Sequence, residues 1–164
     1  MSQIWLVPAF PLLGFLLNGF LGKRFGTRFV SFVGPLAIAL SFAQSLVLFF
    51  QMLEAEGNML REHLYTWIAS GNFEAGINFQ VDQLSGLYLL VITGVGFLIH
   101  VYSVGYMDGE SGYYRFFAYL NLFVFFMLIL VLGDSFLLMF VGWEGVGLCS
   151  YLLIGYYFEK DSAA

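Results

Sequence analysis

Glu144 is the residue of this chain whose type and position are best suited to chemistry. It lies near the middle of residues 136–158, an apolar run long enough to cross a bilayer as a helix. Placing a charged side chain at the bilayer centre costs roughly 2.5–3.5 kcal/mol. We therefore expect the carboxyl group to face a partner charge, a wet cavity or a proton path.

Three other residues are candidates to relay protons or to support Glu144. Tyr151 shares its helical face at about 100° per residue, two turns away. His100 lies near the inner end of an earlier apolar run, where a packed or interfacial histidine is the alternative to a relay. Asp82 stands at a membrane edge, where a helix cap is the alternative. The same face of the Glu144 helix is predicted to carry Leu137, Phe140, Gly147 and Leu148.

Composition places these residues in a membrane protein. Hydrophobic residues are 60% and charged residues 10% of the chain, against about 45–50% and 25% in soluble domains. The apolar runs do not alternate with period two, so we predict an all-α integral membrane protein and not a barrel. The single cysteine, Cys149, excludes a disulfide within the chain and is too little for a metal site.

We predict five transmembrane helices. Residues 1–53 hold the first two, and residues 54–83 form an extracytoplasmic loop with a short hairpin in its second half. Residues 84–158 hold the last three, and 159–164 begin a cytoplasmic loop at which the chain looks truncated. Gly22 and Gly26 are expected to break the chain after the first helix. The expected spans are 4–21, 29–53, 84–107, 113–132 and 136–158.

The basic residues predict the orientation, because cytoplasmic loops carry an excess of Lys and Arg. Alternating spans put all but one of the basic residues on one side and Arg61 on the other. We therefore expect the N-terminus and the 54–83 loop outside and residue 164 in the cytoplasm. The basic side is predicted to hold Lys23, Arg24, Arg28, Arg115 and Lys160.

Two further patterns limit the function. No phosphate loop, dinucleotide fingerprint or cysteine cluster for iron–sulfur binding is recognisable. Aromatic pairs inside or beside the spans are expected to face lipid or form interfacial belts; these are Phe116–Phe117, Phe125–Phe126 and Tyr156–Tyr157. From the residues alone, the chain is a helical membrane protein concerned with moving a proton or cation, or one in which Glu144 only pairs helices.

Three consecutive segments also carry a resemblance. The string GWEGVGLCSYLLIGYY resembles the fifth-helix signature of the antiporter-like membrane subunits of respiratory complex I. VDQLSGLYLLVITGVGFLIHVYSVGYM resembles the third helix of that family, and RFFAYLNLFVFFMLILVL resembles the fourth. The resemblance covers essentially the whole chain, but it covers only the front of a larger antiporter-like helical bundle.

The resemblance implies a role in coupling NADH oxidation and quinone reduction to proton pumping in a bacterial inner membrane. Glu144 would form a charge pair with a lysine outside this chain, because Lys23 and Lys160 both lie in loops. Flavin mononucleotide, iron–sulfur clusters and quinone would be bound by partner subunits, with no cofactor here. The partners would be neighbouring antiporter-like subunits, a distant peripheral arm and lipid, but not nucleic acid. Multi-subunit Na⁺/H⁺ antiporters and membrane-bound hydrogenases share the motifs and are the alternative.

Overall fold

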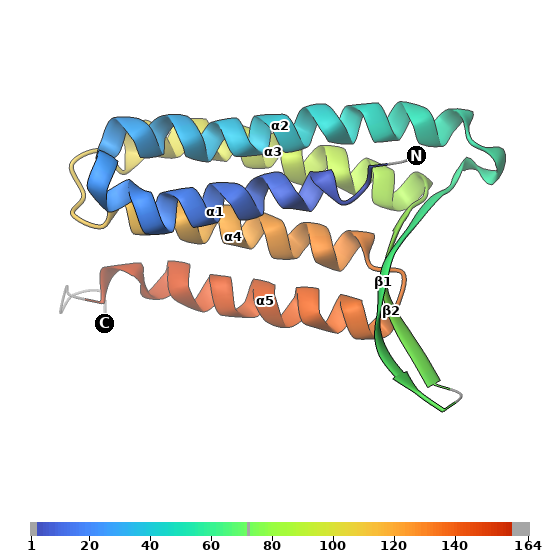
Figure 1. Cartoon of the computed structure of the whole chain (residues 1–164). Coiled ribbons are helices and arrows are strands. Elements are labelled where there is room, and N and C mark those ends of the chain that lie inside the picture. The colour runs from blue at the N-terminus through green and yellow to red at the C-terminus, as the bar shows by residue number, and fades with distance from the viewer. Residues whose placement is uncertain (1–2, 72, 159–164) are drawn as a thin grey trace.

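The computed structural model describes residues 3–71 and 73–158. Five long helices lie side by side and a two-stranded hairpin projects from one end of the bundle (Figure 1). All five helices are long and apolar enough to cross a membrane. The elements are α1 Leu6–Phe25, α2 Thr27–Glu54, β1 Leu60–Ser70, β2 Phe73–Val81, α3 Gln83–Tyr106, α4 Tyr113–Leu132 and α5 Phe136–Ile154, with short 3₁₀ turns at Glu56–Asn58 and Gly155–Tyr157.

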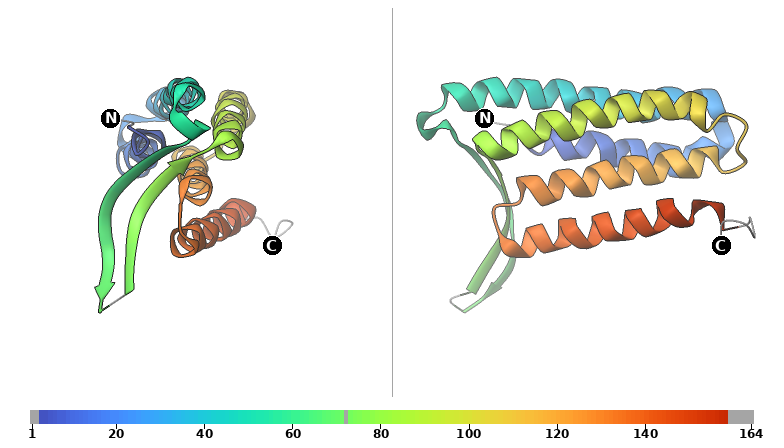
Figure 2. Two further views of the ribbon diagram at one scale, coloured as in Figure 1. Left: turned by 90° about the vertical axis from the view of Figure 1, so that its right-hand side faces the viewer. Right: turned by 180° about the vertical axis from the view of Figure 1, so that it is seen from behind.

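The first four helices form the compact part of the bundle. Helix α1 packs against α2 and α4, and α3 packs mainly against α2. Helix α5 packs against α4 and has no comparable contact with the other helices, so it stands at the edge of the bundle (Figure 2). One whole side of α5 is therefore free of contacts within the described chain.

The predicted spans agree with these helices to within a few residues. Of the two glycines expected to break the chain after the first helix, one does not do so. Gly22 lies inside α1 and does not end it, because its missing side chain makes room for Tyr114 and Val30. Gly26, with φ of 82°, is the residue that separates α1 from α2. Such a backbone conformation is one that glycine adopts at no steric cost.

The hairpin is longer than the sequence predicted. Strands β1 and β2 pair antiparallel from Leu60 with Val81 to Ser70 with Phe73, so both halves of the 54–83 loop take part. Its base is tied to the bundle: Phe79 bridges to Gly133, and the Asp134 N–H donates to the carbonyl of Asn78. The hairpin, which lies between α2 and α3 in the chain, is thus joined to the α4–α5 turn.

The hairpin also completes the start of α1. No side chain caps this helix locally, yet the backbone N–H of Ile4 donates to the Glu62 carboxylate at 2.6 Å and that of Trp5 at 3.3 Å. Unpaired N–H groups at a helix start need such an acceptor, and a negative charge there suits the helix dipole. Glu62 therefore couples β1 to α1 at the hairpin end of the bundle.

Helix α2 supplies the hydrogen bond that a proline inside α1 cannot make. Pro11 has no N–H to offer the carbonyl of Val7, one turn earlier. Ser41 of α2 donates its hydroxyl to that carbonyl at 2.7 Å, with both groups buried. In a membrane, where water cannot serve the free carbonyl, this bond fixes the α1–α2 register.

The aromatic pairs do not all face lipid as predicted. Phe117 is fully buried and Tyr156 nearly so. Both belong to a hydrophobic cluster at the end of the bundle opposite the hairpin, together with Val30, Met107 and Tyr113. Sequence pattern could not reveal this, because α4 is apolar on all sides and only its neighbours decide which residues are covered.

Two glycines let α5 approach α4 closely. A Cβ atom on Gly142 would lie 2.5 Å from the backbone nitrogen of Leu130, and one on Gly145 would overlap the ring of Phe126. Small residues at such contacts are how transmembrane helices pack. Gly147, by contrast, has no atom within 4 Å of its Cβ position.

We expect Gly142→Ala to destabilise the α4–α5 contact by about 1–3 kcal/mol, because an added methyl group must displace backbone atoms. The free energy of unfolding in lipid nanodiscs is the measurement. Gly147→Ala is the matched control on the same helix and should change stability by less than about 0.5 kcal/mol. Equal effects of the two substitutions would contradict the close approach.

Candidate functional site

Glu144 lies near the middle of α5, as the sequence predicted. The helix begins after Ser135, whose hydroxyl accepts a hydrogen bond from the Leu138 N–H at 3.3 Å. Hydrophobic turns on both sides then place Glu144 away from either helix end. Its depth is thus set by the length of an apolar helix, while its direction is set by how α5 packs on α4.

The side chain of Glu144 points away from α4. Gly142, Gly145 and Cys149 are buried against the bundle, and Glu144 is exposed on the other side. The predicted shared face is confirmed for most of its members: Phe140 is 60%, Leu148 53% and Tyr151 75% exposed, and Gly147 is also exposed. Within the described chain Glu144 is uncovered, because the packing glycines occupy the covered side of α5.

No partner for the carboxylate is found within residues 3–71 and 73–158, where Glu144 forms neither a hydrogen bond nor an ion pair. The described cations lie at the ends of the bundle. Lys23 and Arg24 fall in the last turn of α1, Arg28 and Arg115 near the starts of α2 and α4, and Arg61 in the hairpin. Lys160 falls outside the described residues.

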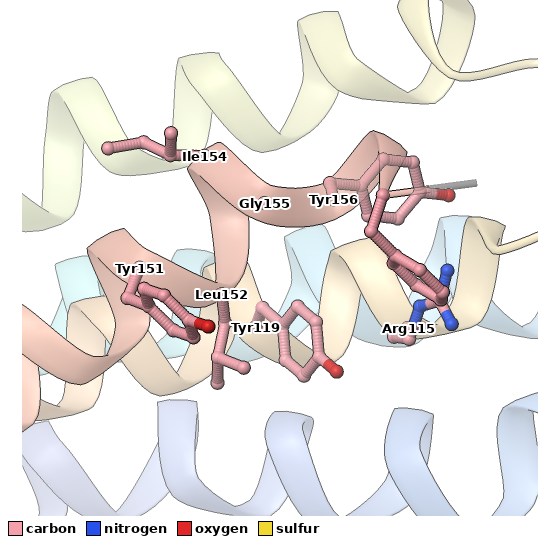
Figure 3. A pocket seen from close by; sticks show the side chains of 8 residues that line it. Arg115, Tyr119, Tyr151, Leu152, Ile154, Gly155 and Tyr156 are labelled. Carbon is pink, nitrogen blue, oxygen red and sulfur yellow. The ribbon is translucent and has the colours of Figure 1, made fainter. Parts of the chain in front are cut away.

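Tyr151 does not contact Glu144. It lines a cavity of about 400 Å³ between α4 and α5 at the end of the bundle opposite the hairpin, together with Arg115 and Tyr119 (Figure 3). The Arg115 guanidinium lies over the rings of Tyr156 and Phe158, at 5.4 and 5.1 Å from their centroids. Arg115 is therefore held by aromatic faces at the end of the bundle opposite the hairpin.

His100 is a packed histidine and not a partner of Glu144. It is fully buried between helices of the compact part, with Nδ1 at 2.7 Å from the carbonyl oxygen of Gly96 and its ring edge-on to Phe117. The packed alternative is the one that this position favours, while Nε2 has no hydrogen-bond partner among the described residues.

Sequence reasoning missed two buried amides, Asn18 in α1 and Asn121 in α4, both with no exposed surface. A polar residue inside an apolar span was the signal that could have found them.

Comparison with known proteins gives the family context. A family model described as "NADH-Ubiquinone oxidoreductase (complex I), chain 5 N-terminus" matches residues 67–117, which include Asp82 and His100 but not Glu144. Over its full length the chain is 44% identical to NADH-quinone oxidoreductase subunit L of Escherichia coli (strain K12). Over 98% of its length it is 46% identical to subunit L of Pseudomonas aeruginosa and 44% identical to that of Mycobacterium tuberculosis (strain H37Rv).

The chain matches an N-terminal part of NADH-quinone oxidoreductase subunit L. It spans about a quarter of the length of these curated relatives: 27%, 26% and 25%, respectively. The antiporter-like segments identified in the sequence and the five helices of the structure agree with this match.

Asp82 is the cap of α3. Its carboxylate accepts a hydrogen bond from the Ser85 N–H at 2.8 Å, and the Ser85 hydroxyl accepts one from the Asp82 N–H at 2.8 Å. This reciprocal capping box satisfies two backbone donors at once. The hydrogen bond from the Ser85 backbone is the main reason that the pKa of Asp82 lies below its ordinary value of 3.8.

We expect Asp82→Ala to lower the free energy of unfolding by about 1 kcal/mol, the usual value of an N-cap. Because the folded pKa is below the unfolded one, the contribution of Asp82 is present above pH 4 or so and is lost as pH falls through the folded pKa. Thermal unfolding of both proteins between pH 3 and pH 7 checks this.

Asp134→Ala is the control for the cap experiment, since Asp134 joins the hairpin through its backbone N–H and not through its side chain. A difference between wild type and Asp82→Ala that stays constant down to pH 3 would contradict the assigned cap.

Proposed function

We propose that this chain is the N-terminal part of a proton-translocating membrane subunit of a bacterial NADH-quinone oxidoreductase. Support comes from relatives named for that enzyme and matched over nearly the whole chain. The observation that carries a role for Glu144 is its position: an ionisable group midway along a spanning helix, turned outward and without a partner among residues 3–71 and 73–158. Intramembrane carboxylates are rare and are usually functional.

In this proposal, Glu144 takes up and releases a proton as the charge beside it changes. A lysine from residues beyond those described approaches the open face of α5 and favours the ionised carboxylate. When that cation withdraws, the carboxylate becomes more basic and binds a proton. The flavin mononucleotide, iron–sulfur clusters and quinone that carry the redox reaction are assigned to partner subunits, so this chain takes part in the translocase without catalysing electron transfer.

Two other functions use the same features. In a multi-subunit Na⁺/H⁺ antiporter or a membrane-bound hydrogenase, Glu144 would have the same proton role with different partners. In a purely structural subunit, Glu144 would only pair helices, and the open face of α5 would bind its neighbour through that pairing. Recovery of redox partner subunits with the full-length chain would distinguish the proposal from the first alternative. The Glu144 substitution described below would distinguish it from the second.

We further propose that the hairpin end of the bundle is extracytoplasmic and the opposite end cytoplasmic. The structure groups four basic residues at the end opposite the hairpin and leaves Arg61 on the hairpin (Figure 1). The four are Lys23, Arg24, Arg28 and Arg115. The positive-inside rule then supports a multi-pass protein of the bacterial inner membrane with its N-terminus outside.

Cysteine labelling tests this orientation in the full-length chain. In a Cys149→Ser background, Thr66→Cys on the hairpin should react with a membrane-impermeant maleimide in sealed right-side-out vesicles. Ser111→Cys, in the turn between α3 and α4, should react only after the vesicles are permeabilised. Both residues are exposed, so the reverse pattern of labelling would invert the proposed orientation.

Glu144→Gln tests the proton role in the assembled complex. Glutamine keeps the size of the side chain but cannot titrate, so we expect proton pumping to fall below roughly half of the wild-type rate while the complex still assembles. A pH-sensitive dye in proteoliposomes reports pumping and a native gel reports assembly. Glu74→Gln on the exposed hairpin is the control, with wild-type pumping expected.

Unchanged pumping with intact assembly would refute the proton role of Glu144. Loss of assembly in Glu144→Gln, with Glu74→Gln unaffected, would favour the structural function.

A further inference from the structure

The inner half of the bundle, on the side away from the hairpin, contains a layer of buried polar side chains. Asn18 of α1, Asn121 of α4 and His100 of α3 have no exposed surface. Each lies about two turns, or roughly 10 Å, from the inner end of its helix. The layer separates two hydrophobic clusters, with Phe117 and Val30 on its inner side and Ile38 and Val124 on its outer side.

Most other buried polar groups of the bundle have partners. Ser41 donates to the carbonyl of Val7, Ser45 to that of Ser41, and Thr93 to that of Leu89. The two amides differ, as do Nε2 of His100 and the hydroxyl of Tyr156, which also lack a partner among the described residues. Asn121 uses Nδ2 to donate to the Phe117 carbonyl at 2.9 Å, but its Oδ1 is unpaired, and both Nδ2 and Oδ1 of Asn18 are unpaired. Each such group costs about 1–3 kcal/mol if it stays unsatisfied.

Two glycines bring the amides to one small volume at the junction of α1, α2 and α4. A Cβ atom on Gly34 would lie 3.4 Å from Nδ2 of Asn18 and 3.5 Å from Nδ2 of Asn121. A Cβ on Gly14 would overlap Oδ1 of Asn121. A larger residue would also meet the Phe117 ring at Gly34 and the Ala37 side chain at Gly14, each at 2.8 Å from the added Cβ, so the glycines allow the amides to pack at this junction.

We propose that a water molecule binds between Asn18 and Asn121 at this junction and bridges α1 to α4. A buried water typically makes about three hydrogen bonds to groups that lack other partners, and the two side chains offer three such atoms. A water molecule can accept a hydrogen bond from Nδ2 of Asn18 and donate one to Oδ1 of Asn121. The two Nδ2 groups cannot bond to each other, because both are donors.

A bound cation fits this position less well than water. Helices α1, α3 and α4 contain no Asp or Glu, and the acid of α2, Glu54, is its last residue at the opposite end. Neutral amides alone would leave a positive charge uncompensated at this depth. The chemistry of the donors therefore favours a neutral ligand that both donates and accepts.

A density map of the full-length chain in its membrane complex, at a resolution that shows ordered water, is the direct test. We expect a peak within hydrogen-bond distance of both amides in the wild type. We expect no such peak in the Asn18→Leu, Asn121→Leu double variant. A direct hydrogen bond between Asn18 and Asn121 with no peak between them would overturn the proposal.

Thermal unfolding of the same complex gives a second test that does not depend on resolution. Each single substitution leaves one amide without its water-mediated partner, so each should lower Tm by roughly 2–4 °C. The double variant should unfold at a higher temperature than either single variant, because no unpaired amide then remains. Additive losses would show that the two residues do not share a ligand and would overturn the proposal.

Discussion

The close approach of α5 to α4 is the constraint on which the candidate site depends. Gly142 and Gly145 are the points of contact, and no side chain can be added at Gly142 without displacing the α4 backbone. Because these glycines fix the covered side of α5, Glu144 must lie on the uncovered side. Without Gly142 and Gly145, α5 could rotate and turn Glu144 toward the bundle, where no described cation lies at its depth.

In the compact part of the bundle, backbone groups that lack a partner within their own helix form hydrogen bonds with side chains of other elements. Ser41 replaces the hydrogen-bond donor that Pro11 lacks, and Glu62 from the hairpin accepts from the start of α1. A bridge from Phe79 to Gly133 ties the same hairpin to the α4–α5 turn. The hairpin end of the bundle is thus closed by long-range polar contacts, while its interior is held by apolar packing around a thin polar layer.

These two regions have different chemical character. Around Glu144, an ionisable group faces outward on a face that is otherwise apolar, which suits contact with further protein that brings a charge. Around Asn18 and Asn121, neutral amides lie inside the four-helix part, which suits a fixed structural contact between helices. The relatives are about four times as long as this chain.

The sequence by itself determined the class, the spans to within a few residues and the mid-helix position of Glu144, because each depends on local composition and length. It also found the cap at Asp82, where spacing within four residues is enough. The tertiary structure alone decided which side of each helix is covered, since α4 and α5 are apolar all round. Helix packing is therefore the reason that Glu144 faces outward and that Phe117 and Tyr156 are buried. Strand pairing extends the hairpin over both halves of its loop. Asn18 and Asn121 lie close together although their helices are far apart in the chain.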